Sequence, residues 1–285
     1  TADIIFTNLE APFCNQPELK AFNKKYTFQV NPELVNVLKT GNINLVSLAN
    51  NHIMDYGIDC LKETFQVLDE HQIQYAGAGL HLNEARKATI FNIKGKRIGF
   101  LAYSLTFPEE FWATDTSAGT CFPYEEFVFS DIRELNRTCD YVIISCHWGE
   151  ELRETPKEYQ VKLAHQFIDV GADLILGHHP HIVQGIELYK DKLIAYSLGN
   201  FIFGSYSENA KVSLLLKVTL NSNEFMNVQI LPISVYNKEV EFQPVPLNEE
   251  QKGRFFEHLT QLSLELNIFP LGITNEGILK VINKS

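Results

Sequence analysis

Short apolar runs alternate along this chain with longer segments in which apolar residues recur every three or four positions. Such runs are typical of buried strands, and the longer spacing is typical of amphipathic helices. Glycine, proline and asparagine separate most of these segments, as they do where a chain turns. The pattern predicts strands at 3–7, 43–48, 73–76, 88–93, 97–103, 141–145, 173–176, 182–188, 193–197, 212–220 and 227–235, and helices at 31–39, 58–71, 124–136, 156–170 and 249–266.

This order of strands and helices predicts an α/β fold, in which polar chemistry gathers at the carboxyl ends of the strands. The polar turns at 94–96 and 221–223 each join two neighbouring strands and predict hairpins. Because no repeat or linker interrupts the sequence, we expect a single domain over 1–285, with 206–285 supplying C-terminal strands and a helix. The first predicted strand begins almost at the first residue, so we also expect that an N-terminal strand is missing.

The negative net charge of the chain restricts the kinds of molecule that it is expected to bind. The sequence has a formal net charge of −11, which argues against binding of nucleic acid through neutralised phosphates. An anionic substrate would need local positive charge, and bound metal ions are the simplest source of it.

Cysteine usage and hydropathy add two expectations. The five cysteines are scattered and form no Cys-x-x-Cys pair, so we expect a reduced protein, with one or two disulfides left open. No run of about 18 apolar residues occurs, so no membrane-spanning segment is predicted.

The run Gly177-His178-His179-Pro180-His181 follows the predicted strand 173–176 directly. Imidazole nitrogen is a good ligand for zinc, iron, nickel or copper. In an extended segment, residues two apart point the same way, so His179 and His181 can face one point. The alternative is a polar surface loop in which the histidines gather by chance.

Other polar groups follow other predicted strands. Glu10 follows 3–7, Asn51 and His52 follow 43–48, and His147 follows 141–145. Together with His179 and His181, the side chains of Glu10, Asn51 and His147 suit a two-metal hydrolytic centre. We therefore predict that the fold brings these five ligands into one site.

The neighbouring residues predict acid–base chemistry. His52 stands next to a predicted ligand and is placed to protonate a leaving group, while Asp55 orients His52 or lies in its surroundings. The alternatives are turn chemistry for the asparagines and an ordinary loop position for His52. A nucleophilic triad fits poorly, because no Gly-x-Ser-x-Gly run exists and Cys146 is expected in the core.

Five short runs, taken together and in this order, resemble the capsule-synthesis CapA family, a branch of the calcineurin-like metallophosphatase superfamily associated with poly-γ-glutamate. The resemblance covers about 1–205. The matching runs are Asn8-Leu9-Glu10, Asn50-Asn51-His52 with Asp55-Tyr56-Gly57, His147-Trp148-Gly149 with Glu151, His179-Pro180-His181, and Ser197-Leu198-Gly199-Asn200-Phe201.

The resemblance implies a four-layer αββα metallophosphatase-like sandwich with divalent metal ions at its loop edge, up to two of them, of manganese, zinc or iron. It implies that Asn51, His147, His179 and His181 bind metal and that His52 is catalytic. Glu10 stands where the superfamily usually has a bridging aspartate. The family's first motif, a Gly-Asp pair on an N-terminal strand, is missing from this chain, which leaves one metal short of a carboxylate. We further predict that Glu151, His178 and Asn200 contact substrate.

These observations favour a metal-dependent hydrolase of capsule or poly-γ-glutamate synthesis or processing. Its substrate would be an anionic polymer or a phosphoester, and other capsule synthesis proteins are candidate partners. The alternatives are a non-catalytic component of a capsule synthesis or export complex and a metal-dependent phosphodiesterase. The compartment is not predicted, although attachment to the cell surface through a missing N-terminal segment is compatible with the family.

Overall fold

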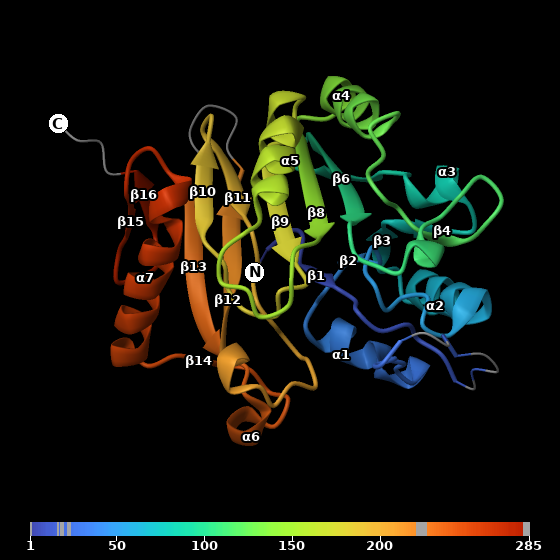
Figure 1. Cartoon of the computed structure of the whole chain (residues 1–285), viewed down its shortest axis with the longest axis horizontal. Coiled ribbons are helices and arrows are strands. Elements are labelled where there is room, and N and C mark those ends of the chain that lie inside the picture. The colour runs from blue at the N-terminus through green and yellow to red at the C-terminus, as the bar shows by residue number, and fades with distance from the viewer. Residues whose placement is uncertain (1, 16, 18–19, 22–23, 221–226, 282–285) are drawn as a thin grey trace. The chain divides into compact units, whose positions relative to one another are not determined.

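The structure is a computed structural model, and it describes the chain except for residues 1, 16, 18–19, 22–23, 221–226 and 282–285 (Figure 1). The predicted turn at 221–223 lies outside the described residues. The chain divides into two compact units, Thr1–His147 and Trp148–Ser285. The single domain over 1–285 stays a prediction.

The first unit contains two larger groups of paired strands, and parallel pairings occur in both. In one sheet, β2 lies between β1 and β3 and runs parallel to both. In the other, β6 pairs parallel with β8 and forms the predicted hairpin with β5. The strands are β1 (Phe6–Asn8), β2 (Leu45–Ser47), β3 (Gln74–Ala76), β5 (Thr89–Ile93), β6 (Lys96–Ser104) and β8 (Tyr141–His147), and a short antiparallel pair joins β4 (Ala78–Gly79) to β7 (Gly119–Thr120).

Helices connect these strands at the predicted places, with shifted ends. The helix predicted at 31–39 begins as a 3-10 turn, Pro32–Leu34, capped by the Asn31 side chain. The helix predicted at 124–136 begins four residues later than expected, at Val128. The helices of the first unit are α1 (Val35–Thr40), α2 (Gly57–Glu70), α3 (Leu82–Ala85) and α4 (Val128–Thr138).

Alternate residues of the strands build a four-layer arrangement in the first unit. Ala76 and Phe100 share one buried cluster, so these faces of β3 and β6 pack against each other. On the opposite face of β3, Tyr75 stacks on Phe65 of α2 at 5.0 Å between ring centroids. On the opposite face of β6, a side chain at Gly99 would meet Leu135 of α4 at 2.5 Å, so only glycine allows this approach. The predicted helix–sheet–sheet–helix order is thereby confirmed for the first unit.

The second unit is also built from helices and strands, which confirms the mixed α/β class. β11 pairs parallel with β9 and antiparallel with β10, and β13 pairs antiparallel with β12 and β14. Helix α7 packs on β10, where the Ser263 hydroxyl accepts a hydrogen bond from the Ile186 amide at 2.9 Å. The elements are α5 (Glu158–Asp169), β9 (Leu174–His178), β10 (Ile186–Tyr189), β11 (Lys192–Ala195), β12 (Val212–Thr219), β13 (Asn227–Ser234), α6 (Asn237–Val240), β14 (Val245–Pro246), α7 (Glu249–Ser263), β15 (Leu271–Ile273) and β16 (Leu279–Val281). No helix in the described ranges has the length and apolar character needed to cross a membrane.

One cysteine pair departs from the expected reduced state. Cys14 and Cys60 form a disulfide that ties the segment after β1 to helix α2. Next to it, the Thr64 hydroxyl accepts a hydrogen bond from the Phe13 amide at 2.9 Å. Cys121, Cys139 and Cys146 are buried free thiols, and Cys146 lies in the core as predicted. A reduced protein was the simplest expectation, and this bond is one of the one or two disulfides that the sequence left open.

We predict that replacing both Cys14 and Cys60 with serine lowers the free energy of unfolding by about 2–5 kcal/mol, because the bond restricts the unfolded chain. Urea unfolding under non-reducing conditions measures the change. Cys139→Ser, a substitution of a buried thiol outside the bond, is the matched control for loss of a sulfur atom. Equal unfolding midpoints for the double variant and the unreduced wild type would contradict the assignment.

Candidate metal centre and acid–base pair

The candidate ligands of the first unit stand at the carboxyl ends of its parallel strands. Glu10 comes two residues after the end of β1, Asn51 lies in the loop between β2 and α2, and His147 is the last residue of β8. Carboxyl ends of strands in such folds are free to carry polar side chains, because the loops there are not needed for the core. The structure places all three positions at strand ends, as expected, and their role as metal ligands stays a prediction.

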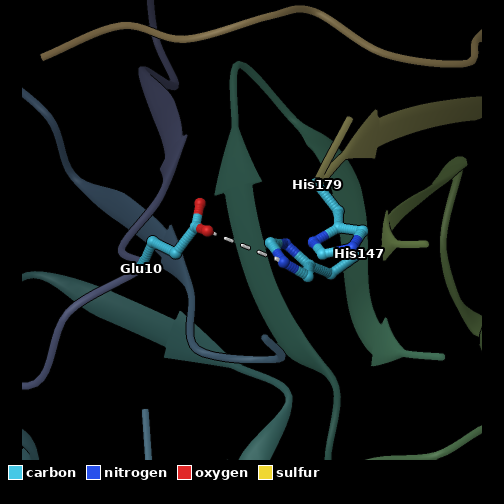
Figure 2. Close-up of side chains that lie close together, drawn as sticks. All are labelled: Glu10, His147 and His179. Carbon is cyan, nitrogen blue, oxygen red and sulfur yellow. Dashed lines mark ion pairs between the residues drawn. The ribbon is translucent and has the colours of Figure 1, made fainter. Parts of the chain in front are cut away.

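Two oxygen atoms face the same nitrogen of His147. The Asn51 Oδ1 lies 2.9 Å from His147 Nε2, and the Glu10 Oε1 lies 3.9 Å from the same atom. Figure 2 shows the Glu10 carboxylate and the His147 ring directed toward each other. His147 is buried, with 1% of its side chain exposed, and Glu10 is nearly buried. A carboxylate, an amide oxygen and an imidazole nitrogen are therefore gathered at one point with little solvent between them.

These donor types fit a divalent transition metal. Carboxylate and amide oxygens and imidazole nitrogen are the ligands that manganese, iron and zinc take in proteins. The second carboxylate oxygen of Glu10 accepts a hydrogen bond from Asn8 Nδ2 at 3.0 Å, which fixes the direction of the carboxylate. Outer contacts of this kind orient metal ligands. The residues present thus fit a metal ion held by Glu10, Asn51 and His147.

Asn50 holds the two loops of this group together. Its Nδ2 donates to the Leu9 carbonyl at 2.8 Å and to Asn8 Oδ1 at 3.1 Å. Its Oδ1 accepts from the backbone amides of His52 and Ile53, each at 3.0 Å. Asn50 is fully buried, so its role is to bind the end of β1 to the loop after β2. The turn chemistry considered for the asparagines applies to Asn50.

His52 and Asp55 form the predicted pair. His52 Nδ1 lies 2.6 Å from Asp55 Oδ2, and that oxygen also accepts from the Phe28 amide at 2.7 Å. Because a carboxylate only accepts hydrogen bonds, Nδ1 carries the proton and Nε2 is left for proton exchange with a substrate. The Phe28 ring packs on the imidazole at 4.1 Å between centroids and restricts its rotation.

Lys24 completes this pair and was not predicted. Its ammonium group bonds Asp55 Oδ1 and the Asn51 carbonyl, and it lies 3.1 Å from His52 Nδ1. Since Nδ1 already donates to Asp55, the contact between the ammonium and Nδ1 is a close approach between two donors. A single lysine in a polar segment carries no sequence signal, so only the fold places it beside residues about 30 positions away.

In the second unit, Gly177 allows β9 to reach the histidine run. A side chain at Gly177 would lie 1.9 Å from the Tyr196 carbonyl, which also accepts a hydrogen bond from Trp148 Nε1 at 3.0 Å. No residue larger than glycine fits there without moving the backbone. The close approach fixes where β9 ends and where the histidines begin.

The side chains of His179, His181 and Glu151 form the second ligand group. One potential ligand atom from each lies within 4.8 Å of the others. The Oδ1 of Asn200, which is buried, lies 2.8 Å from His181 Nδ1. With the amide in this orientation, Nδ1 donates and Nε2 of His181 is free of a proton. The Ser197-to-Phe201 run therefore supplies a residue that orients a histidine.

His178 is the last residue of β9 and directly precedes His179. Desolvation lowers the pKa of His178 to about 4, so its ring is neutral near pH 7. Its carbonyl accepts a hydrogen bond from the Trp148 amide at 3.1 Å. The substrate contacts of Glu151, His178 and Asn200 stay predictions. So does the union of all five predicted metal ligands in one site.

Comparisons with known proteins give a consistent assignment. The sequence model of a family described as "Bacterial capsule synthesis protein PGA_cap" matches residues 1–205. The PGA biosynthesis protein CapA of Bacillus subtilis (strain 168) is 32% identical over 250 residues, which are 87% of this chain and 65% of that protein. The capsule biosynthesis protein CapA of Bacillus anthracis is 29% identical over 267 residues, 91% of this chain and 64% of that protein. The chain thus spans slightly less than two thirds of the length of these relatives.

Solved structures are similar at a lower level. A putative 5'-nucleotidase from Staphylococcus aureus matches with a TM-score of 0.48 and 15% identity over 82% of this chain and 47% of its own. A 5'-nucleotidase precursor from Thermus thermophilus matches with a TM-score of 0.45 and 17% identity over 69% and 40%.

We predict that Lys24 and Asp55 are energetically coupled by about 0.5–3 kcal/mol, because they are a nearly buried ion pair. In metal-free protein, Lys24→Met should lower the free energy of unfolding much more in the wild type than in an Asp55→Asn background. Urea unfolding of the four proteins of this cycle measures the coupling.

Lys25→Met provides the matched control, since the Lys25 side chain is exposed and its ammonium lies over the Tyr26 ring at 5.0 Å. Its effect should be the same in both backgrounds. Strictly additive effects of Lys24→Met and Asp55→Asn would show that the ion pair makes no contribution of its own.

Proposed function

The chain belongs to the bacterial capsule synthesis family PGA_cap, and on that premise we propose that it is a metal-dependent hydrolase. Its proposed substrate is an anionic capsule polymer of the poly-γ-glutamate type, in keeping with the names of its relatives from the two Bacillus species. The observation that carries the proposal is the meeting of Glu10 Oε1 and Asn51 Oδ1 at His147 Nε2, beside the pair formed by His52 and Asp55.

Two divalent ions, of manganese, zinc or iron, are proposed as cofactors. The first would be held by Glu10, Asn51 and His147, and the second by His179 and His181. Bound ions of this kind lower the pKa of a water molecule and polarise the bond that is cleaved. They would also supply positive charge that a chain of net charge −11 needs in order to bind a polyanion.

The residues of the chain itself supply the proton for the leaving group. Asp55 accepts a hydrogen bond from His52 Nδ1 and holds the ring. When a second proton is bound at Nε2, that atom gives it to the departing nitrogen or oxygen, and the ring returns to the form protonated at Nδ1 alone. Phe28 packs on one face of this ring and limits access of water from that side. Lys24 fixes the other oxygen of Asp55, so the carboxylate cannot turn away from the histidine.

The experiment compares His52→Ala with the wild type after loading with manganese. We expect the variant to keep its bound metal and to lose about 10²–10⁴-fold in turnover, the usual contribution of a general acid. Hydrolysis of poly-γ-glutamate and of a chromogenic phosphodiester, each measured with metal content, gives both quantities. The two substrates also separate polymer hydrolysis from a phosphodiesterase.

His71→Ala is the matched control, because His71 follows α2 and contacts the Val67 carbonyl at 2.8 Å. It should retain both metal and turnover. A metal-loaded wild type that cleaves neither substrate would overturn the hydrolase proposal and favour a non-catalytic component of a capsule synthesis complex.

A further inference from the structure

We propose that Glu151 is a metal ligand that completes, with His179 and His181, a metal site lying wholly within the second unit. The inference rests on the proposed function, because it concerns the second of the two ions proposed above. It changes the role of Glu151 from a predicted substrate contact to a ligand. Two imidazoles and one carboxylate form a ligand set that zinc, manganese and iron accept.

Distance is the first support for this site. Glu151, His179 and His181 each place a potential ligand atom within 4.8 Å of the other two. Atoms bound to one ion at about 2.0–2.2 Å lie no more than about 4.4 Å apart, so only small side-chain adjustments are needed. The rings of His179 and His181 lie 6.1 Å apart between centroids and are tilted by 51°, so they do not stack on each other.

The backbone holds Glu151 against the histidine run. The amide of Leu152, the next residue, donates to the carbonyl of Pro180, which lies between the two histidines, at 2.8 Å. Leu152, His179 and His181 have φ angles of 59°, 97° and 61°, in the left-handed region that favours glycine. Residues of this kind adopt such angles only where surrounding contacts impose them, and they cluster at functional sites.

The outer contacts of the site are also in place. Asn200 Oδ1 accepts from His181 Nδ1 at 2.8 Å, which directs the unprotonated Nε2 away from Asn200. The Nδ2 of Asn200 is buried and makes no hydrogen bond with any described residue. This donor is therefore available to an oxygen atom of a molecule bound at the site.

The charges of the loop distinguish Glu151 from its neighbour. Glu150 forms an ion pair with Lys157 at 2.9 Å and approaches Arg153 at 3.8 Å. Within the described ranges, Glu151 makes no ion pair or hydrogen bond, and it is exposed. Two adjacent acids of one loop thus differ: one is neutralised by cations, and the other faces two histidines with its charge uncompensated.

The charge of a divalent ion explains why a carboxylate such as Glu151 suits this site. Two neutral imidazoles leave the charge of a divalent ion uncompensated, and manganese in particular favours carboxylate oxygen. Glu151 would supply a negatively charged oxygen to the second ion from the loop that lies against the histidine run.

The test is titration of the metal-free full chain with manganese and with cobalt, followed by calorimetry and by cobalt absorption. We expect Glu151→Gln to weaken one of two binding events by at least about tenfold, since changes around metal ligands alter affinity by about 10–100-fold. His181→Ala should abolish the same event, and Glu10→Gln should weaken the other one. Glu150→Gln is the matched control and should leave both unchanged.

The binding results test the Glu151 site and the two-metal hydrolase independently of each other. Two ions bound with unchanged affinity in Glu151→Gln would overturn the Glu151 assignment and leave the hydrolase proposal standing. One ion, lost in Glu151→Gln and retained in Glu10→Gln, would support the Glu151 site and contradict the two-metal hydrolase. Because Glu151 is exposed, the variant should fold, and an unchanged melting temperature of the metal-free protein confirms that it does.

Discussion

Four hydrogen bonds of the buried Asn50 amide hold the candidate site of the first unit together. Because both ends of this amide are satisfied, the loop after β2 has one position relative to the end of β1. Glu10 and His52 depend on that tie, since Glu10 directly follows Leu9, whose carbonyl Asn50 binds, and the His52 amide itself donates to Asn50. The candidate metal ligands of the first unit and the pair formed by His52 and Asp55 are thus parts of one hydrogen-bonded structure.

In the second unit, the histidine run is held in place by a close approach between two backbone segments. Gly177 lets the end of β9 lie against the Tyr196 carbonyl. His179 and His181 follow with left-handed backbone angles, and a potential ligand atom of each lies within 4.8 Å of the other. Asn200 fixes one of these rings through its Oδ1. In both units, then, a buried asparagine holds candidate site residues in place.

The sequence predicted most strands, the hairpin at 94–96 and the place of each candidate ligand, because strand ends are marked by apolar runs followed by polar residues. It missed Lys24 and the Cys14–Cys60 bond, since both depend on contacts between segments that are far apart in the sequence. The predicted substrate contacts of Asn200 and Glu151 remain open, because a motif shows which residues belong together and not which atoms meet. The start of α4 was predicted too early for a local reason. Tyr124 to Phe127 form a turn closed by a hydrogen bond from the Phe127 amide to the Tyr124 carbonyl, and the helix begins only at Val128.

The central claim is that the chain binds divalent metal through Glu10, Asn51 and His147. Metal stoichiometry of purified wild type and His147→Ala, measured by mass spectrometry after loading and gel filtration, tests it most directly. The account predicts two ions per chain in the wild type and one fewer in the variant. No metal in the wild type after loading with manganese, zinc or iron, or equal metal in both proteins, would contradict it.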